Sequence, residues 1–149
     1  MKAMIDTNVF IDFVQCREPF YAHSKHVLDL AADKKLEGIM TATSAKDIFY
    51  ITERLLGADA ARDVLNKFAF VFSFSGVDGA DVLEALSHDV DDFENCLISG
   101  SAKKSGADII VTRNVKDFAE SDVPAIHPMD IDHVLDGRFE NGAFCIDNP

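Results

Sequence analysis

The sequence predicts an α/β domain in which a parallel sheet carries helices on both faces. Short apolar segments of strand length alternate with longer segments of helical periodicity, and this alternation is typical of a parallel sheet. Polar residues directly follow several of the apolar segments, at the strand ends where such sheets bind ligands. The 149 residues are enough to bury a sizeable core. We therefore expect one domain over residues 1–136, with residues 137–149 as a tail.

Five segments have the length and composition of strands, because each is short, apolar and rich in β-branched or aromatic residues. The expected strands are residues 2–5, 38–43, 70–74, 108–112 and 123–127. In and just before the expected strand 70–74, every second residue is a phenylalanine, and we expect all four in the core. They are Phe68, Phe70, Phe72 and Phe74.

Between the strands, apolar residues recur with helical spacing. Pro19 can open a helix, because its missing N–H is not needed there. Thr43 or Ser44 can cap another, with Asp47 in the position of a capping-box acid, and Gly57 ends that helix. The expected helices are residues 9–14, 23–34, 44–56, 59–68, 78–86, 91–104 and 129–135.

The net charge of −12 argues against a bulk electrostatic affinity for nucleic acid or for an anionic membrane. No apolar run approaches the roughly 18 residues of a membrane span, and the N-terminus lacks the pattern of a secretory signal, so we expect a cytoplasmic protein without a membrane partner. A local basic cluster remains. It is either a solvated helix end or a rim that contacts phosphates, and it contains Lys103, Lys104, Arg113 and Lys116.

Acidic and amide side chains stand where expected strands end or helices begin. They are Asp6 and Asn8, Asp47, the group Asp91, Asp92, Glu94 and Asn95, and Asn114 with Asp117. Each alone has a structural explanation as a cap, a first-turn acid or a turn residue. Together, at the carboxyl ends of neighbouring strands, they would repel one another without a cation, so the joint pattern predicts a Mg²⁺ or Mn²⁺ site.

On the helix expected from residue 91, Asp92, Asn95 and Ser99 share one face by i, i+3 and i+4 spacing. That spacing lets Asp92 and Asn95 point together into a crevice. We expect the adjoining stripe, which contains Phe93, Cys96, Leu97 and Gly100, to pack on the sheet. Glu94 then lies nearly opposite that stripe, in solvent.

Three segments, MIDTNVFIDF, TSAKDIFYI and DDFENCLISGSAKKSGADIIVTRNVKDF, together resemble the PIN-domain family, and in particular the bacterial PIN proteins of toxin–antitoxin pairs. The resemblance runs from residue 2 to about residue 135. It implies a three-layer α/β/α domain with a central parallel sheet. It also implies a Mg²⁺- or Mn²⁺-dependent ribonuclease, whose partners are RNA, a small antitoxin protein and a second copy of the chain.

By position, Asp6 matches the first metal-binding aspartate of the family and Asp47 the second acid. Asn95 stands where the third acid is commonly aspartate, so its amide would bind a cation more weakly, and Asp92 one turn earlier could supply the missing charge. The residues expected to take part in catalysis are Asp6, Asp47, Asp92, Asn95 and Asn114, and those expected to bind metal are Asp6, Asp47, Asp92, Asn95 and Asp117. The residues expected to contact substrate are Thr7, Asn8, Ser44, Thr112, Arg113, Lys103, Lys104 and Lys116.

The expected chemistry is attack of a metal-activated water on the phosphorus of RNA, leaving a 5′ phosphate and a 3′ hydroxyl. Two other functions stay open. An aspartyl-phosphate hydrolase also begins with an Asp after its first strand, but it needs a second Asp two residues later, where this chain has Asn8. The second is a PIN-like binding module without cleavage activity, which the replacement of an acid by Asn95 suggests.

Overall fold

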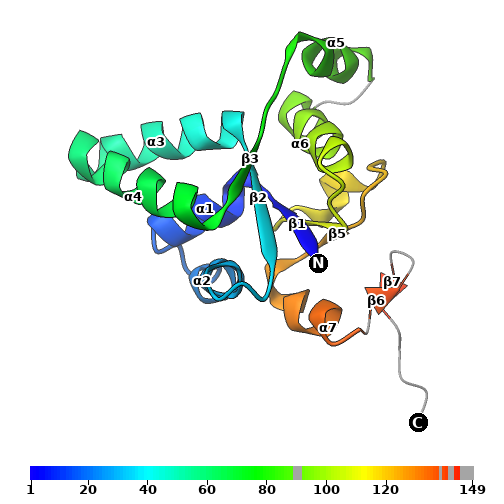
Figure 1. Ribbon diagram of the computed structural model, residues 1–149, viewed down its shortest axis with the longest axis horizontal. Helices are drawn as coiled ribbons and strands as arrows, with labels where there is room; N and C mark the ends of the chain where they lie inside the picture. The colour runs from blue at the N-terminus through cyan, green and yellow to red at the C-terminus, as the bar shows by residue number, and fades with distance from the viewer. Residues whose placement is uncertain (89–91, 138, 141–142, 145–149) are drawn as a thin grey trace.

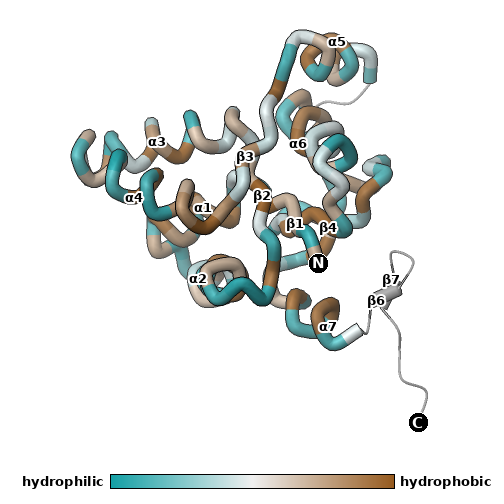
Figure 2. The backbone as a smooth tube through the Cα atoms, in the orientation of Figure 1, coloured by the Kyte–Doolittle hydropathy of each residue, from teal (hydrophilic) through white to brown (hydrophobic). Residues whose placement is uncertain are grey.

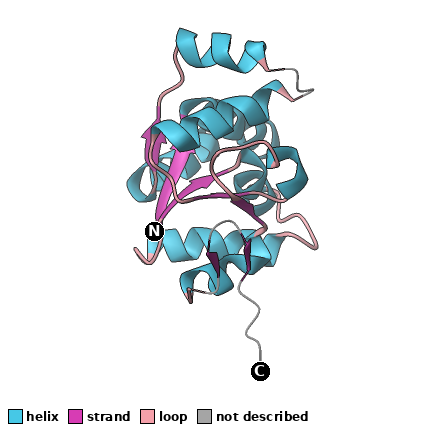
Figure 3. Ribbon diagram, turned by 90° about the vertical axis from the view of Figure 1, so that its right-hand side faces the viewer, coloured by secondary structure: helices cyan, strands magenta, loops and turns pink. Residues whose placement is uncertain are grey.

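The computed structural model has a five-stranded parallel sheet between layers of helices (Figures 1 and 3). It describes residues 1–88, 92–137, 139–140 and 143–144. The strand order is β3-β2-β1-β4-β5, so β1 lies at the centre and pairs with β2 and β4. The strands are β1 (Lys2–Ile5), β2 (Glu37–Thr41), β3 (Ser73–Ser75), β4 (Ile109–Val111) and β5 (Ala125–Ile126). The predicted α/β three-layer class is confirmed.

Helices connect the successive strands up to β4, and a 3-10 turn lies between β4 and β5. The helices are α1 (Thr7–Val14), α2 (Tyr21–Ala32), α3 (Ala42–Leu56), α4 (Ala58–Val71), α5 (Gly79–Ser87), α6 (Phe93–Lys104) and α7 (Ile131–Leu135), with 3-10 turns η1 (Val115–Phe118) and η2 (Pro128–Asp130). Beyond α7, in the segment expected as a tail, β6 (Phe139–Glu140) pairs antiparallel with β7 (Ala143–Phe144). Within the described residues, no helix combines the length and the apolar character that a membrane span requires.

The core has two parts because successive side chains of a strand point to opposite faces of the sheet. Ala3 and Ile5 of β1 belong to the larger cluster, which α1, α2, α3, α4 and α7 cover. Met4 belongs to the smaller one, with Ile98 of α6 and Phe118 of η1. Figure 2 shows the hydrophobic colours along β2 and β4, at the centre of the molecule. The carboxyl ends of the central strands are therefore held rigidly from both sides.

The third strand begins later than predicted, because α4 continues up to the residue before Phe72. Phe68 and Phe72 are four positions apart at the end of this helix, so they point to the same side. Each packs on Phe10 with ring centroids 5.1 Å apart. Phe70 lies on the opposite side of α4 and is 94% exposed, and Phe74 is exposed as well. The prediction of a core position is thus wrong for Phe70 and Phe74.

Candidate functional site

The carboxyl end of β1 places Asp6 at the centre of the sheet edge. Its backbone N–H donates to the carbonyl of Val111 at 3.0 Å, which extends the pairing of β1 with β4 by one residue. Asp6 is also the N-cap residue of α1, in extended conformation, and it is only 4% exposed. Its carboxylate is thus fixed by the strand on one side and by the helix on the other, and is shielded from water.

A side chain of α1 and one that directly follows β4 meet at one oxygen of Asp6. The Thr112 hydroxyl and the Asn8 amide both donate to Oδ2 of Asp6, each at 2.6 Å. The Asn8 Oδ1 atom in turn accepts the backbone N–H of Arg113 at 3.3 Å. The backbone N–H of Asn114 donates to the Thr112 hydroxyl at 3.0 Å, while the Asn114 residue is exposed. Four of the predicted site residues, Asp6, Asn8, Thr112 and Asn114, are therefore brought together.

Hydroxyl groups extend this site toward β2. The Thr7 Oγ1 atom lies 2.7 Å from Oγ of Ser44, which lies 2.7 Å from Oγ1 of Thr41. All three residues are buried. Thr7 and Ser44, both predicted to contact substrate, thus hold the start of α1 against the start of α3.

The start of α3 differs from the prediction. Thr41 is the N-cap residue, and its hydroxyl accepts the backbone N–H of Ser44 at 3.0 Å. The predicted cap at Thr43 or Ser44 is wrong because the helix begins earlier, at Ala42. Asp47 consequently lies beyond the first turn and not in a capping box. Its carboxylate is 3.0 Å from Nζ of Lys46, and its expected role in metal binding stays a prediction.

Glu94 is exposed, as predicted, and its carboxylate also contacts the Asp6 site, which the sequence did not predict. The Thr7 hydroxyl donates to Oε1 of Glu94 at 3.1 Å. Glu94 precedes Ile98, which packs on the sheet, by four residues, so it lies on the same side of α6, at its exposed end. The predicted packing stripe is wrong for Phe93, which is 42% exposed, and right for Leu97, which is buried. The other buried residues of α6 are Ile98, Ser101 and Ala102.

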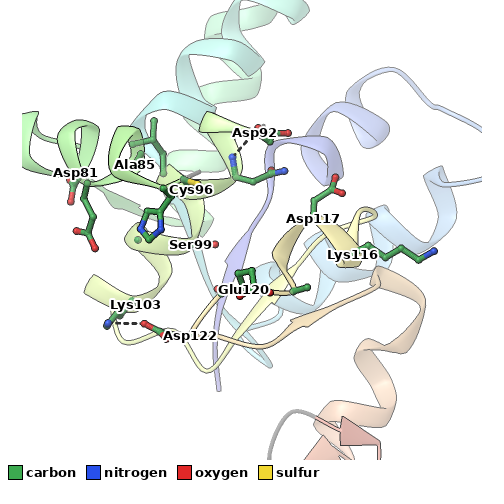
Figure 4. Close-up of a pocket in the computed structure, with 17 residues that line it drawn as sticks. Asp81, Ala85, Asp92, Cys96, Ser99, Lys103, Lys116, Asp117, Glu120 and Asp122 are labelled. Atoms are coloured by element: carbon green, nitrogen blue, oxygen red, sulfur yellow. Dashed lines mark hydrogen bonds and ion pairs between the residues drawn. The ribbon is translucent and has the colours of Figure 1, made fainter. Parts of the chain in front are cut away.

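Asp92, Asn95 and Asp117 line a different part of the surface, a pocket of about 660 Å³ between α5, α6 and the segment after β4. Figure 4 shows Asp92 and Asp117 at one end of this pocket. Oδ1 of Asp92 accepts the backbone N–H of Asn95 at 3.2 Å, which caps α6. The structure thus brings these three predicted ligands to one pocket, with Asp92 engaged as a cap. Asp91 lies outside the described residues.

The predicted basic rim is largely neutralised by acids. Lys103 pairs with Asp122 at 2.7 Å, at the end of the pocket opposite Asp92 (Figure 4). Lys104 pairs with Asp81, also at 2.7 Å. Lys116 is exposed and, among the described residues, forms no ion pair. It is the predicted phosphate contact with the least competition from neighbouring acids.

Arg113 is held beneath the site by a buried acid. Its Nε atom lies 2.8 Å from Oδ2 of Asp12, and its guanidinium stacks over the ring of Phe20, 4.4 Å from the centroid. Asp12 is fully buried, and its Oδ1 atom has no hydrogen-bond partner among the described residues. Burial raises the pKa of Asp12, and the Arg113 charge opposes that shift.

Like Asp12, Asp6 is a buried acid with a raised pKa, but the two differ in the charges beside them. Burial raises the pKa of Asp6 to about 6; the hydrogen bond from Thr112 opposes this rise, and the nearby Glu94 carboxylate adds to it. Among the described residues no Lys or Arg pairs with Asp6. A buried carboxylate without a counter-charge favours the binding of a cation.

The donor set fits a cation that keeps part of its water shell. Within residues 1–88 and 92–137, no three acidic, histidine or cysteine side chains are placed to hold a metal ion together. Mg²⁺ commonly binds through one or two carboxylates, retains several waters and takes further oxygens from substrate phosphates. The Asp6 carboxylate meets that requirement, with the other oxygens left to water and substrate.

Sequence reasoning missed two residues of this region, Glu94 and Asp12. For Glu94, the spacing to Leu97 and Ile98 was the available signal. For Asp12, the signal was its position four residues after Asn8, on the same side of α1.

Comparisons with known proteins agree with this fold. The model of the PIN domain family matches residues 2–116. The structure is similar to a chain of VapBC2 from Rickettsia felis bound to a DNA fragment from their promoter (TM-score 0.61, 14% identity, 85% of this chain and 98% of that chain). It is also similar to a chain of DNA-bound VapBC from Salmonella typhimurium, with a TM-score of 0.62 and 17% sequence identity. That match covers 86% of this chain and 98% of the other.

A third similar structure is Mycobacterium tuberculosis VapC20, described as a toxin that cleaves the sarcin-ricin loop (TM-score 0.57, 15% identity, 72% of this chain and 86% of that chain). No curated protein matches the sequence. At these identities the structural neighbours establish the fold alone, whereas the family model covers most of the chain. This chain therefore belongs to the PIN domain family.

Proposed function

We propose that the protein is a Mg²⁺- or Mn²⁺-dependent endoribonuclease and the toxin of a toxin–antitoxin pair. The observation that carries this proposal is Asp6, a carboxylate buried at the carboxyl ends of β1 and β4 without a cationic partner among the described residues. The similarity to a toxin that cleaves the sarcin-ricin loop supports RNA as the substrate.

Asp6 would hold the cation, while Asn8 and Thr112 fix the orientation of its carboxylate through their hydrogen bonds to Oδ2. A bound Mg²⁺ or Mn²⁺ supplies Lewis-acid polarisation of a phosphoryl oxygen and a lower pKa for an attacking water. Asp47 remains a candidate for a second acid, because it follows Ser44 by three residues and so lies on the same side of α3. Lys116 is our candidate for an RNA phosphate contact, since its charge is not paired within the described structure.

A small antitoxin is the second partner that we propose, because several of the neighbours come from VapBC complexes. The α3–α4 hairpin projects from the sheet (Figure 1) and carries exposed apolar side chains, a feature typical of interaction surfaces. They are Tyr50, Leu55, Leu56 and Phe70. The homodimer expected from the sequence stays a prediction.

Cleavage of structured RNAs, with Mg²⁺, with Mn²⁺ and with EDTA, tests the enzymatic proposal. The wild type should cleave only with a divalent ion, and Asp6→Asn should abolish cleavage while the circular dichroism spectrum stays native. Glu53→Gln, which removes one exposed charge from α3, is the matched control and should cleave normally. Metal-independent cleavage, or an active Asp6→Asn variant at matched purity, contradicts the proposed site.

The runner-up function is a PIN-fold binding module without cleavage activity. It is favoured by Asn95 in place of an acid and by the absence of a three-acid metal cluster among the described residues. A protein that binds RNA but takes up no Mn²⁺ in calorimetry, and cleaves nothing, would support this alternative.

A further inference from the structure

We propose that Glu94 is the second carboxylate of the Asp6 metal site, in the role that the sequence pattern assigns to Asn95 or Asp92. The assignment rests on the proposed metal-dependent function. It deepens that function by naming which acid of α6 acts with Asp6.

The direction of α6 is the first support. Ile98 is buried against the sheet, and the exposed Glu94 stands one turn before it on the same side of α6. Since α6 begins at Phe93, Glu94 lies in its first turn, beside the carboxyl end of β1. Its side chain therefore starts from the packed face of α6, at the edge of the sheet that holds Asp6.

A direct contact is the second support. The Thr7 hydroxyl, next to Asp6 in the chain and buried, donates to Oε1 of Glu94 at 3.1 Å. Thr7 is itself fixed by Ser44 at 2.7 Å. Glu94 is thus oriented by a residue of the Asp6 site, and Oε2 has no described hydrogen bond, so it can accept a cation.

The alternative residues of α6 are placed differently. Oδ1 of Asp92 caps the helix by accepting the N–H of Asn95. Both residues line the pocket between α5 and α6, together with Asp117. No described contact joins them to Asp6, Thr7 or Thr112, whereas Glu94 has one with Thr7. In this assignment Glu94 supplies the carboxylate of α6. The site therefore has this carboxylate although residue 95 is a neutral asparagine.

Mn²⁺ binding to the full chain, measured by isothermal titration calorimetry without RNA, tests the assignment. Glu94→Gln should weaken Mn²⁺ binding by roughly 10-fold or more, because loss of a charged ligand should cost at least as much as loss of an outer-shell partner, which costs roughly 10- to 100-fold. Glu94→Asp should recover part of that affinity because it restores the charge. Glu53→Gln is the charge-matched control and should bind Mn²⁺ like the wild type. Urea unfolding of each variant in EDTA verifies that all are folded.

The possible results separate the two proposals. If Glu94→Gln binds Mn²⁺ as tightly as Glu53→Gln while Asp6→Asn does not bind it, the Glu94 assignment is overturned and the proposed nuclease stands. If the wild type takes up no Mn²⁺, both are overturned. A loss in Glu94→Gln with partial recovery in Glu94→Asp supports Glu94 as a ligand, because a merely structural role would not follow the charge.

Discussion

Asp6→Asn should make the metal-free protein more stable. The pKa of Asp6 is raised from 3.8 to about 6, so ionising this residue is less favourable in the folded state than in the unfolded chain. A difference of about 2.2 pKa units corresponds to about 3 kcal/mol of lost stability above pH 7. The asparagine removes that cost. Its amide hydrogens have no assigned partners, and leaving them unpaired reduces the gain in stability by about 1 kcal/mol. We expect a net gain of about 2 kcal/mol.

The dependence on pH has a definite sign. Because the folded-state pKa is the higher one, the wild type loses stability as pH rises from 3.8 to about 6. The advantage of Asp6→Asn should therefore be about 2 kcal/mol at pH 7.5, fall to about 0.6 kcal/mol at pH 5, and vanish near pH 4.5, because the amide cost does not depend on pH. Below that range Asp6 is protonated in both states and its burial no longer opposes folding.

Urea denaturation in EDTA measures this difference. With an m-value of about 2 kcal/mol/M, a gain of 2 kcal/mol moves the midpoint up by about 1 M urea at pH 7.5. Mn²⁺ at about 100 times its dissociation constant should add about 2.7 kcal/mol to the wild type alone, which reverses the order. Glu53→Gln is the control for a simple change of net charge. A variant that is less stable than the wild type in EDTA at pH 7.5, by an amount independent of pH, refutes the reasoning.

Two further predictions concern the packing around the site. Arg113→Met should lower the free energy of unfolding at pH 7 by about 3–5 kcal/mol, because Asp12 is then buried without a cation; an unchanged urea midpoint would show that the ion pair adds nothing. Phe72→Ala should cost about 3–5 kcal/mol in the same assay, because it empties a buried aromatic position. Phe70→Ala, 94% exposed, is the matched control and should stay within about 0.5 kcal/mol of the wild type. Equal losses in both phenylalanine variants would contradict the assignment of the α4 core face.

The centre of the sheet could be predicted because its signals are local. A short apolar run that ends in Asp6 fits a buried strand followed by a helix cap, and the structure has both. The run before Thr112 is equally clear, and the alternation of elements then requires the two strands to be parallel. The pairing of β1 with β4 places the Thr112 hydroxyl beside the Asp6 carboxylate. Nothing in either segment predicts this pairing, because it depends on the whole fold.

Helix faces were harder to predict, because two periodicities competed. On α6 the large apolar residue Phe93 suggested one stripe, but the buried stripe includes the small residues Ser101 and Ala102, which let the helix approach the sheet closely. That choice missed the contact of Glu94 with Thr7. Similarly, phenylalanines at every second position have the spacing of a strand, whereas Phe68 and Phe72, four residues apart, have the spacing of a helix.

The hydrogen bond from Thr112 to Asp6 joins residues 106 positions apart, so the Asp6 site depends on most of the chain. At translation rates of about 5–20 residues per second, a nascent chain carries Asp6 for roughly 5–20 s before its partner strand exists. Contacts of such long range also form late in folding, since the intervening loop must close first. A polypeptide whose synthesis stops before β4 would therefore lack the Asp6 site, because β1 alone cannot build it.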